Sequence, residues 1–227
     1  MNRAAFLERV RRAAQAGRTY RVQLAEIPDG AGYVGGGSDL CTTLAAEVDA
    51  VGGQAEILSS LHDVRPALER LLDEYTVERA LCWQHSLLDQ LGIQKVLEQK
   101  CIQQDSHNSL AKLSFIEQRE RVLAAGVGIS SADYAIAETG SLVVCSKPGR
   151  ERVVTLLPPV HIAIIDESQI LPDLFDLFSR LQAAGLDTLP SNLAFITGPS
   201  KTGDIELQLT TGVHGPGKWH LLIVRAT

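Results

Sequence analysis

Closely spaced cysteines are missing from this sequence of 227 residues. Its four cysteines stand at least nineteen positions apart, whereas zinc knuckles, iron–sulfur clusters and redox dithiols use pairs that are only a few residues apart. The six histidines show no HExxH or similar pairing. We therefore expect this chain to hold no metal and no cofactor, and each cysteine to be a small buried hydrophobe or an idle thiol.

Long apolar runs and an excess of basic residues are also missing. No run approaches the roughly eighteen apolar residues of a membrane span, and a net charge of -6 provides no basic footprint for nucleic acid. The N-terminus, MNRAAFLERVRRAAQAGR, is charged and amphipathic where a signal peptide would have an apolar core. We expect a cytoplasmic protein that neither spans a membrane nor binds duplex nucleic acid.

What the sequence does contain is enough apolar material for one sizeable core, since 45% of its residues are hydrophobic. Apolar residues recur every three or four positions over residues 3–16 and stop at Gly17, which predicts an amphipathic helix. Residues 28–39 are rich in glycine and lack an apolar period. The predicted organisation is therefore an N-terminal helix and linker over 1–39 and one main domain over 40–227.

Helical and strand patterns alternate in the first half of the main domain. Helices are predicted near 40–50, 62–74, 85–91 and 112–125, the last closed by Gly126. Strands are predicted over 54–58 and 78–83. Alternation with short connections is typical of an α/β domain whose sheet is largely parallel.

After Gly126 the pattern becomes β-rich. Apolar stretches with only turns between them predict strands over 126–130, 134–138, 141–145, 152–157 and 161–166. A helix near 169–184 and strands over 193–197 and 219–224 complete the domain. The predicted fold class is therefore α/β, with a mostly parallel sheet flanked by helices and a β-rich insert.

Four glycine-bearing segments at predicted strand ends are candidates for the lining of a binding site. Ligands of α/β sheets bind outside the carboxyl ends of the strands, where backbone N–H groups of loops can face anions. The segments are GGGSD (35–39), AETGS (137–141), GPSKTGDIE (198–206) and GVHGPG (212–217).

Glu138 is the first candidate catalytic residue. It follows the apolar alternation YAIA and precedes Thr139 and Gly140, so it lies where a predicted strand enters a tight turn. A partly desolvated carboxylate at such a position suits acid/base or nucleophilic chemistry, with Thr139 and Gly140 as ligand-binding neighbours. The alternative is a glutamate that caps the turn or pairs with a lysine or arginine.

The segment GPSKTGDIE has the residue types of a phosphate loop but not the order. A Walker A loop places its lysine after the second glycine, whereas Lys201 precedes Gly203. Gly198 begins a predicted turn, and the hydroxyls of Ser200 and Thr202 either cap that turn or bind an anion beside Lys201. Gly198, Ser200, Lys201 and Thr202 are therefore candidate ligand-binding residues.

Two further acid/base candidates lie in the last two segments. If residues 204–209 form one strand, Asp204 and Glu206 share a face that lies either in a pocket or in water. His214 is held in a short Gly/Pro loop, and Gly215 next to it is a candidate ligand-binding position. A Ser/His/Asp triad has all its ingredients here, but only geometry can identify one.

The sequence contains four motifs in this order: GVGISSADYAIAETGSLVV, LLPPVHIAII, FITGPSKTGDIE and GVHGPG. Together they resemble the lactate-utilisation protein C family, also called LutC/YkgG or the LUD domain. The resemblance covers roughly residues 40–225. It implies a fold like that of the ribose-5-phosphate isomerase, glucosamine-phosphate deaminase and CoA-transferase superfamily. It also implies a bacterial component of L-lactate oxidation to pyruvate, acting beside partner subunits that carry the iron–sulfur clusters. Glu138 matches the position of the glutamate nucleophile of CoA-transferase relatives.

Three hypotheses about function follow. The first is a lactate-utilisation subunit whose pocket, lined by Glu138, Lys201, Asp204 and His214, binds a small carboxylate or a phosphorylated ligand. The second is a non-catalytic interaction subunit that organises the iron–sulfur partners. The third is a stand-alone enzyme of the isomerase or CoA-transferase type.

Overall fold

The computed structural model describes residues 3–17, 35–185, 188–205 and 208–225, without the side chains of 14–17, 203–205 and 208–210. The chain divides into two compact units, Met1–Val34 and Gly35–Thr227. The first unit contains the predicted N-terminal helix, α1 (Arg3–Gly17). Its apolar residues Phe6, Leu7 and Val10 are all exposed.

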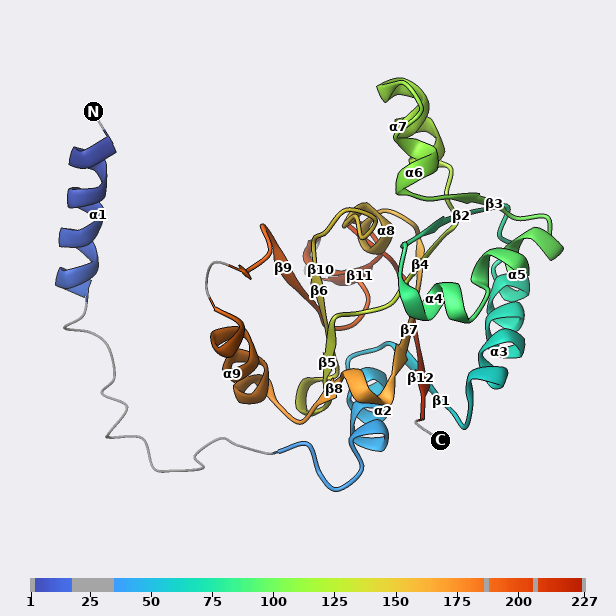
Figure 1. Ribbon diagram of the computed structural model, residues 1–227, viewed down its shortest axis with the longest axis horizontal. Helices are drawn as coiled ribbons and strands as arrows, with labels where there is room; N and C mark the ends of the chain where they lie inside the picture. The colour runs from blue at the N-terminus through green and yellow to red at the C-terminus, as the bar shows by residue number, and fades with distance from the viewer. Residues whose placement is uncertain (1–2, 18–34, 186–187, 206–207, 226–227) are drawn as a thin grey trace. The chain divides into compact units, whose positions relative to one another are not determined.

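The second unit is built on a six-stranded sheet in which every pair of neighbours is parallel (Figure 1). This confirms the predicted fold class of an α/β protein with a mostly parallel sheet. In spatial order the strands are β1 (Gln54–Leu58), β12 (Lys218–Val224), β7 (Val160–Asp166), β4 (Val127–Ser130), β2 (Arg79–Cys82) and β3 (Gln103–Asp105).

Because the strands are in register, one side-chain row crosses the sheet through Leu81, Gly128, His161 and Trp219. Neighbouring rows point to the opposite face. That opposite face is covered by α3 (Leu61–Glu74), α4 (Ser86–Gln90) and α5 (Ile93–Gln99).

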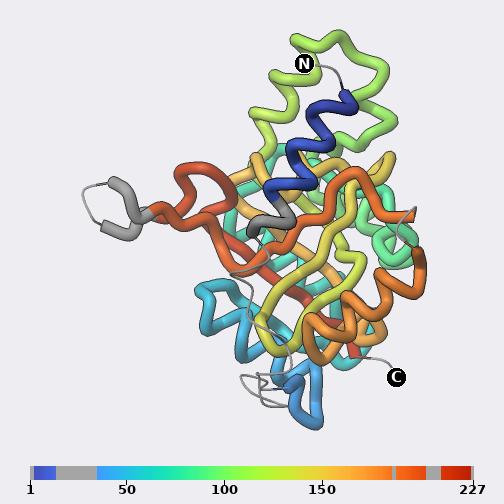
Figure 2. Tube along the Cα trace, turned by 90° about the vertical axis from the view of Figure 1, so that its left-hand side faces the viewer, coloured from blue at the N-terminus to red at the C-terminus, as the bar shows by residue number. Residues whose placement is uncertain are grey.

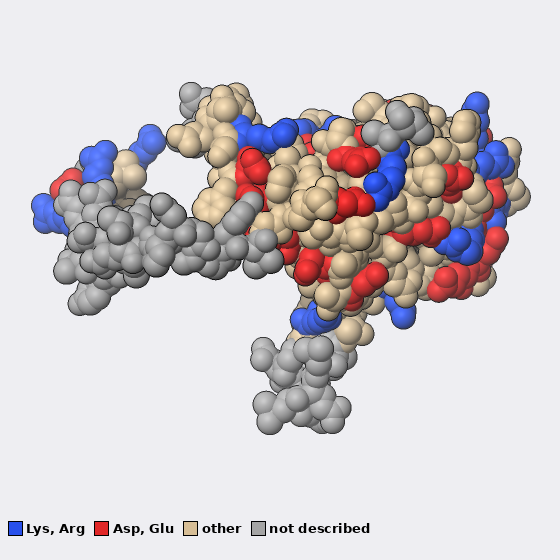
Figure 3. Space-filling view, turned by 90° about the horizontal axis from the view of Figure 1, so that it is seen from below, with Lys and Arg blue, Asp and Glu red and all other residues tan. Residues whose placement is uncertain are grey.

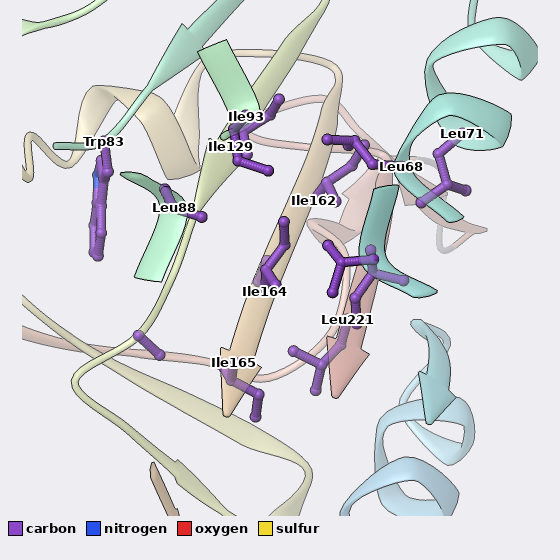
Figure 4. Close-up of a cluster of buried hydrophobic side chains, with 14 of the residues drawn as sticks. Leu68, Leu71, Trp83, Leu88, Ile93, Ile129, Ile162, Ile164, Ile165 and Leu221 are labelled. Atoms are coloured by element: carbon purple, nitrogen blue, oxygen red, sulfur yellow. The ribbon is translucent and has the colours of Figure 1, made fainter. Parts of the chain in front are cut away.

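The main hydrophobic core extends over both faces of the large sheet, and on this face it fills the space between the sheet and the three helices. The apolar residues of α3 recur with helical spacing and are buried, as in Leu68 and Leu71. Leu68 meets the strand side chain Ile162 in Figure 4. Strands buried on both faces appear in sequence as the near-continuous apolar runs HIAII and HLLIV.

The row that includes His161 and Trp219 faces a second layer. This layer contains α2 (Leu40–Ala50), the short helix α8 (Val153–Leu156) and a four-stranded sheet. The order of that sheet is β8 (Ile170–Leu171), β5 (Tyr134–Ile136), β6 (Ser141–Cys145) and β9 (Leu193–Ile196). The predicted β-rich insert corresponds to this sheet, although residues 126–130 and 161–166 supply β4 and β7 of the large sheet instead.

The remaining elements lie at the periphery. Helices α6 (His107–Leu110) and α7 (Phe115–Leu123) extend beyond the β3 side of the large sheet (Figure 1), and α9 (Leu174–Ala184) follows β8. The hairpin of β10 (Lys201–Ile205) and β11 (Gln208–Thr211) projects from the two sheets (Figure 2). Over the larger unit, acidic and basic side chains lie interspersed on the face shown in Figure 3.

Residues 152–157, predicted as a strand, instead contain helix α8. The β-branched and apolar residues of RVVTLL are typical of β-structure, but tertiary packing decides the conformation here. The backbone of α8 lies so close to the sheet that a Cβ added to Gly128 would be 1.8 Å from the carbonyl oxygen of Val154. A helical turn fits at this position because Gly128 has no side chain.

Several predicted boundaries are also wrong. The helix predicted over 112–125 is the shorter α7, and Gly126 does not close it, because the Gly126 N–H donates to the Arg79 carbonyl. The helix predicted over 169–184 begins only at Leu174, after β8. Residues 204–209 do not form one strand, since β10 ends at Ile205 and β11 begins at Gln208.

Candidate functional site

A cavity of about 210 Å³ lies between the loop that follows β9 and the loop that precedes β12. Residues 195–198 and Ser200 form one wall, and residues 214–216 form another. Residues 155–156 of α8 form a third wall, and the floor is the side-chain row of the large sheet, through His161 and Trp219. The cavity therefore brings together two of the four predicted glycine-bearing segments.

His161 is the most unusual group in this cavity. It is completely buried, and its Nε2 lies 2.8 Å from the Ser130 hydroxyl in a hydrogen bond. Its Nδ1 is buried and has no hydrogen-bond partner among the residues that the structure describes. Burial, with a smaller contribution from His220, lowers the pKa of His161 to about 3, so the imidazole is neutral at physiological pH.

Trp219 also lines the cavity and also carries a polar atom without a partner among the described residues. Its indole packs on Gly53, where an added Cβ would be 2.6 Å from the ring, and only 2% of the residue is exposed. The indole Nε1 is buried, and no described residue forms a hydrogen bond with it. Buried polar groups are usually satisfied. Of the four orphaned side-chain atoms in the described residues, two belong to residues that line this one cavity, which makes the cavity a candidate site for a small polar molecule.

The two cavity loops are held to each other by the backbone. The Ser200 N–H donates to the Pro216 carbonyl at 2.9 Å, and the Gly212 N–H donates to the Ser200 carbonyl at 2.9 Å. A Cβ on Gly215 would lie 3.1 Å from that of Ser200. The predicted ligand-binding residues Gly198, Ser200 and Gly215 thus line the cavity, and so does the exposed His214.

The segment AETGS touches this site without lining it. A chain of hydroxyls links the two, because Thr139 Oγ1 donates to Ser141 Oγ at 2.8 Å and Ser141 Oγ lies 2.7 Å from Thr197 Oγ1. Glu138 is half-buried on a single 3₁₀ turn, η3 (Ala137–Thr139), and its N–H donates to the Pro172 carbonyl. The predicted strand therefore ends at Ile136, before Glu138.

Gly140 ends this turn in the left-handed conformation, with a φ of 62°. A Cβ at this position would be 2.6 Å from the backbone of Glu47 in α2. Because Gly140 has no side chain, the turn can pack directly against the backbone of α2.

The side chain of Lys201 forms a hydrogen bond with another part of the protein and does not line the cavity. Its Nζ donates to the Val51 carbonyl at 2.5 Å, at the C-terminal end of α2, where a cation is favourable. Gly198, with a φ of 89°, approaches the same carbonyl. Thr202 pairs with Thr210 in the β10–β11 hairpin. The side chain of Asp204 and the whole of Glu206 lie outside the described residues.

The segment GGGSD lies at the opposite end of α2. Asp39 caps the helix by accepting from the N–H groups of Cys41 and Thr42, and it pairs with Arg225 at 2.5 Å. The hydrogen bond from Arg225 lowers the pKa of Asp39 to about 2. Asp39 thus already occupies the N–H groups that an anion would need, and this segment is separate from the cavity.

Three of the cysteines are buried, and burial raises the pKa of Cys41 to about 11, of Cys82 to about 12 and of Cys145 to about 11. Such thiols stay protonated, which disfavours roles as nucleophiles or metal ligands. Within the part of the chain that the structure describes, no three His, Cys, Asp or Glu side chains gather as a metal site would require. No helix in the described ranges has the length and apolarity to cross a membrane.

His161 and Trp219 were not identified as candidates from the sequence, because each begins an apolar run that predicts only a buried strand. The signal was nevertheless present. A histidine or tryptophan inside a buried strand carries ring nitrogens that normally need hydrogen-bond partners, and a largely apolar run provides few of them.

The fold and the cavity define an α/β protein with a small site between loops of its second layer. A family model for the LUD domain matches residues 41–224, so the chain belongs to the LUD domain family, and the resemblance drawn from its motifs is confirmed.

Curated relatives agree with this membership. Lactate utilization protein C of Halalkalibacterium halodurans is 37% identical over 152 residues, which are 66% of this chain and 64% of that protein. Its namesake in Shouchella clausii is 34% identical over 163 residues, 70% and 67% of the two chains. The chain thus spans slightly less than two thirds of the first relative.

A solved structure shares the fold. The crystal structure of a DUF162 family protein from Deinococcus radiodurans matches with a TM-score of 0.55, covering 81% of this chain and 94% of that one. The sequence identity is 17%, so this likeness bears on the fold alone.

Proposed function

We propose that this protein is a subunit of a lactate-utilisation system and that the cavity at His161 and Trp219 binds a small carboxylate such as L-lactate or pyruvate. The names of the relatives support the first part of the proposal. The two orphaned polar groups support the second part and carry it. A volume of about 210 Å³ lies below the roughly 300–1,000 Å³ of pockets for drug-sized ligands, which favours a molecule of few atoms.

The chemistry of the two groups suits a 2-hydroxy or 2-keto acid. The Trp219 indole can only donate, so it would bind a carboxylate oxygen. The neutral His161 imidazole has one donor and one acceptor nitrogen. If Ser130 donates to Nε2, then Nδ1 carries the proton and is a donor, and in the reverse arrangement Nδ1 accepts. A hydroxyl group satisfies either arrangement.

The wider proposal places this cytoplasmic chain beside iron–sulfur partner subunits that support the oxidation of L-lactate to pyruvate, with no cofactor of its own. It also relates the fold to the ribose-5-phosphate isomerase, glucosamine-phosphate deaminase and CoA-transferase superfamily. The parallel sheet and the position of Glu138 just after strand β5 support that relation. In this structure Glu138 is not among the residues that line the cavity.

Calorimetric titration with L-lactate and pyruvate tests the binding, and ribose 5-phosphate tests the phosphorylated alternative. The variant Trp219→Phe keeps an aromatic ring and removes the donor, so lactate affinity is expected to fall about tenfold or more. The matched control is Trp83→Phe, because the Trp83 indole already donates to the Glu151 carbonyl at 3.0 Å. Absence of binding by either acid, or equal losses in the two variants, would contradict the proposal.

A second candidate function is an interaction subunit that organises the iron–sulfur partners. The observation that favours it is the apolar side of α1, where Phe6, Leu7 and Val10 are 52%, 42% and 49% exposed. Co-purification from the native host, with Leu7→Glu as the variant and Arg11→Glu as the control on the same helix, tests this role. A chain that is recovered without partners before any substitution would remove it.

A further inference from the structure

A second and larger cavity of about 510 Å³ lies near the carboxyl ends of β2 and β3. The chain runs outward from β2 to the edge strand β3 and then returns to β4 on the inner side of β2, so the strand order reverses at this point. Crevices at such reversals are the common ligand sites of open α/β sheets. The candidate site described above does not use this cavity.

Helix α8 separates the two cavities. Val153 and Val154 line the larger one, whereas Thr155 and Leu156 line the smaller one. The larger cavity is roofed by α6 and α7, which extend beyond the sheet (Figure 1). Its ligand is therefore independent of the one proposed for His161 and Trp219.

The walls of the larger cavity are mainly apolar. Leu81 comes from β2, Leu110 and Ala111 from α6 and its C-cap, and Phe115 and Val122 from α7. Phe115 is 78% exposed, and no residue of α7 is fully buried. An apolar molecule in the cavity would cover surface that the protein leaves in contact with water.

The acidic groups of the cavity are already paired. Asp105, which is almost fully buried, accepts from Arg79 at 2.5 Å and from Arg121 at 3.1 Å. Glu151 lies 2.5 Å from Nδ1 of His107. Neither carboxylate is therefore free to attract a cation.

Arg119 provides the remaining charge. This exposed residue of α7 lines the cavity and makes no ion pair with any residue that the structure describes. An arginine beside an apolar cavity suits a ligand with an apolar body and one carboxylate, since its guanidinium presents a fork that matches carboxylate geometry.

We propose that this cavity binds a monocarboxylic acid with an apolar chain or ring. The apolar body lies between α8 and the α6–α7 pair, and the carboxylate meets Arg119 near the exposed Phe115. The volume of about 510 Å³ lies within the roughly 300–1,000 Å³ range of pockets for drug-sized molecules.

Titration with dodecanoate, with 4-phenylbutyrate and with the uncharged dodecanol tests the site and separates its two parts. We expect at least one of the two acids to bind saturably, with a Kd of about 100 μM or tighter. Arg119→Gln should weaken binding of that acid by about two- to fivefold, which is the range for an exposed ion pair. The same variant should leave the affinity for dodecanol unchanged. Lys112→Gln is the matched control, because Lys112 precedes α7 and does not line the cavity.

A filling variant tests the apolar part. Ala111 lies on the exposed side of the cavity, so Ala111→Trp can occupy it with little effect on the core, and circular dichroism checks that the variant folds. We expect this variant to lose at least tenfold in affinity for the bound acid. The proposal is overturned if neither acid binds saturably, if Ala111→Trp binds as tightly as the unaltered protein, or if Arg119→Gln and Lys112→Gln have equal effects.

Discussion

Acid should destabilise this protein through His161. The folded state holds this imidazole neutral, with a pKa of about 3, whereas an unfolded histidine has its ordinary value of 6.5. Between these two values the unfolded state binds a proton that the folded state does not. Stability therefore rises with pH in this window and is lost as pH falls from about 6.5 towards 3.

The magnitude follows from the two pKa values. Each pKa unit between the states corresponds to about 1.4 kcal/mol once pH lies well inside the window. Lowering pH from 7 to 5 should therefore cost the folded state roughly 2 kcal/mol through His161 alone. His220 and His85, whose pKa values are also lowered by burial, add to the loss in the same direction.

Urea unfolding at pH 7, 6 and 5 measures this effect in the protein and in His161→Gln. The variant keeps a polar side chain that can form a hydrogen bond with Ser130 but removes the titrating group. Between pH 7 and pH 5 its free energy of unfolding should therefore fall by roughly 2 kcal/mol less than that of the unaltered protein. His62→Gln, exposed on α3, is the control for the loss of a histidine. If His161→Gln retains the full pH dependence of the unaltered protein, the argument from burial is wrong.

Three further outcomes are expected from urea or thermal unfolding. Gly140→Ala should cost at least about 1 kcal/mol more than Gly92→Ala, because both have positive φ but only Gly140 meets backbone; equal losses would exclude the contact as the cause. Gly128→Ala should cost about 3 kcal/mol or more, since its Cβ would overlap the Val154 carbonyl, and an unchanged melting temperature would contradict this. Asp105→Asn should cost about 2–3 kcal/mol by leaving two arginines facing a neutral amide, and a stability within error of the unaltered protein would refute it.

Much of the fold follows from local patterns. Gly17 ends α1, the spacing of Leu68 and Leu71 predicts α3, and the apolar runs that contain Ile162 and Leu221 predict buried strands. Each of these elements depends mainly on its own periodicity. The conformation of α8 could not be predicted, because it depends on a glycine in another strand.

The candidate site could be predicted only in part. Gly198, Ser200, His214 and Gly215 line one cavity, since glycine-bearing loops at strand ends tend to gather. The position of Lys201 against α2 depends on where that helix ends in space, which residue spacing does not determine.

The position of β12 in the sheet constrains how the chain can fold during synthesis. Residue 54 pairs with residue 220, and β12 separates β1 from β7. The ribosome synthesises β1 and β7 well before β12. Until β12 is made, each of these two strands has an unpaired edge, which is prone to wrong pairing. The β1 side of the large sheet is therefore completed last. Contacts over such separations make folding slow compared with proteins that rely on local contacts.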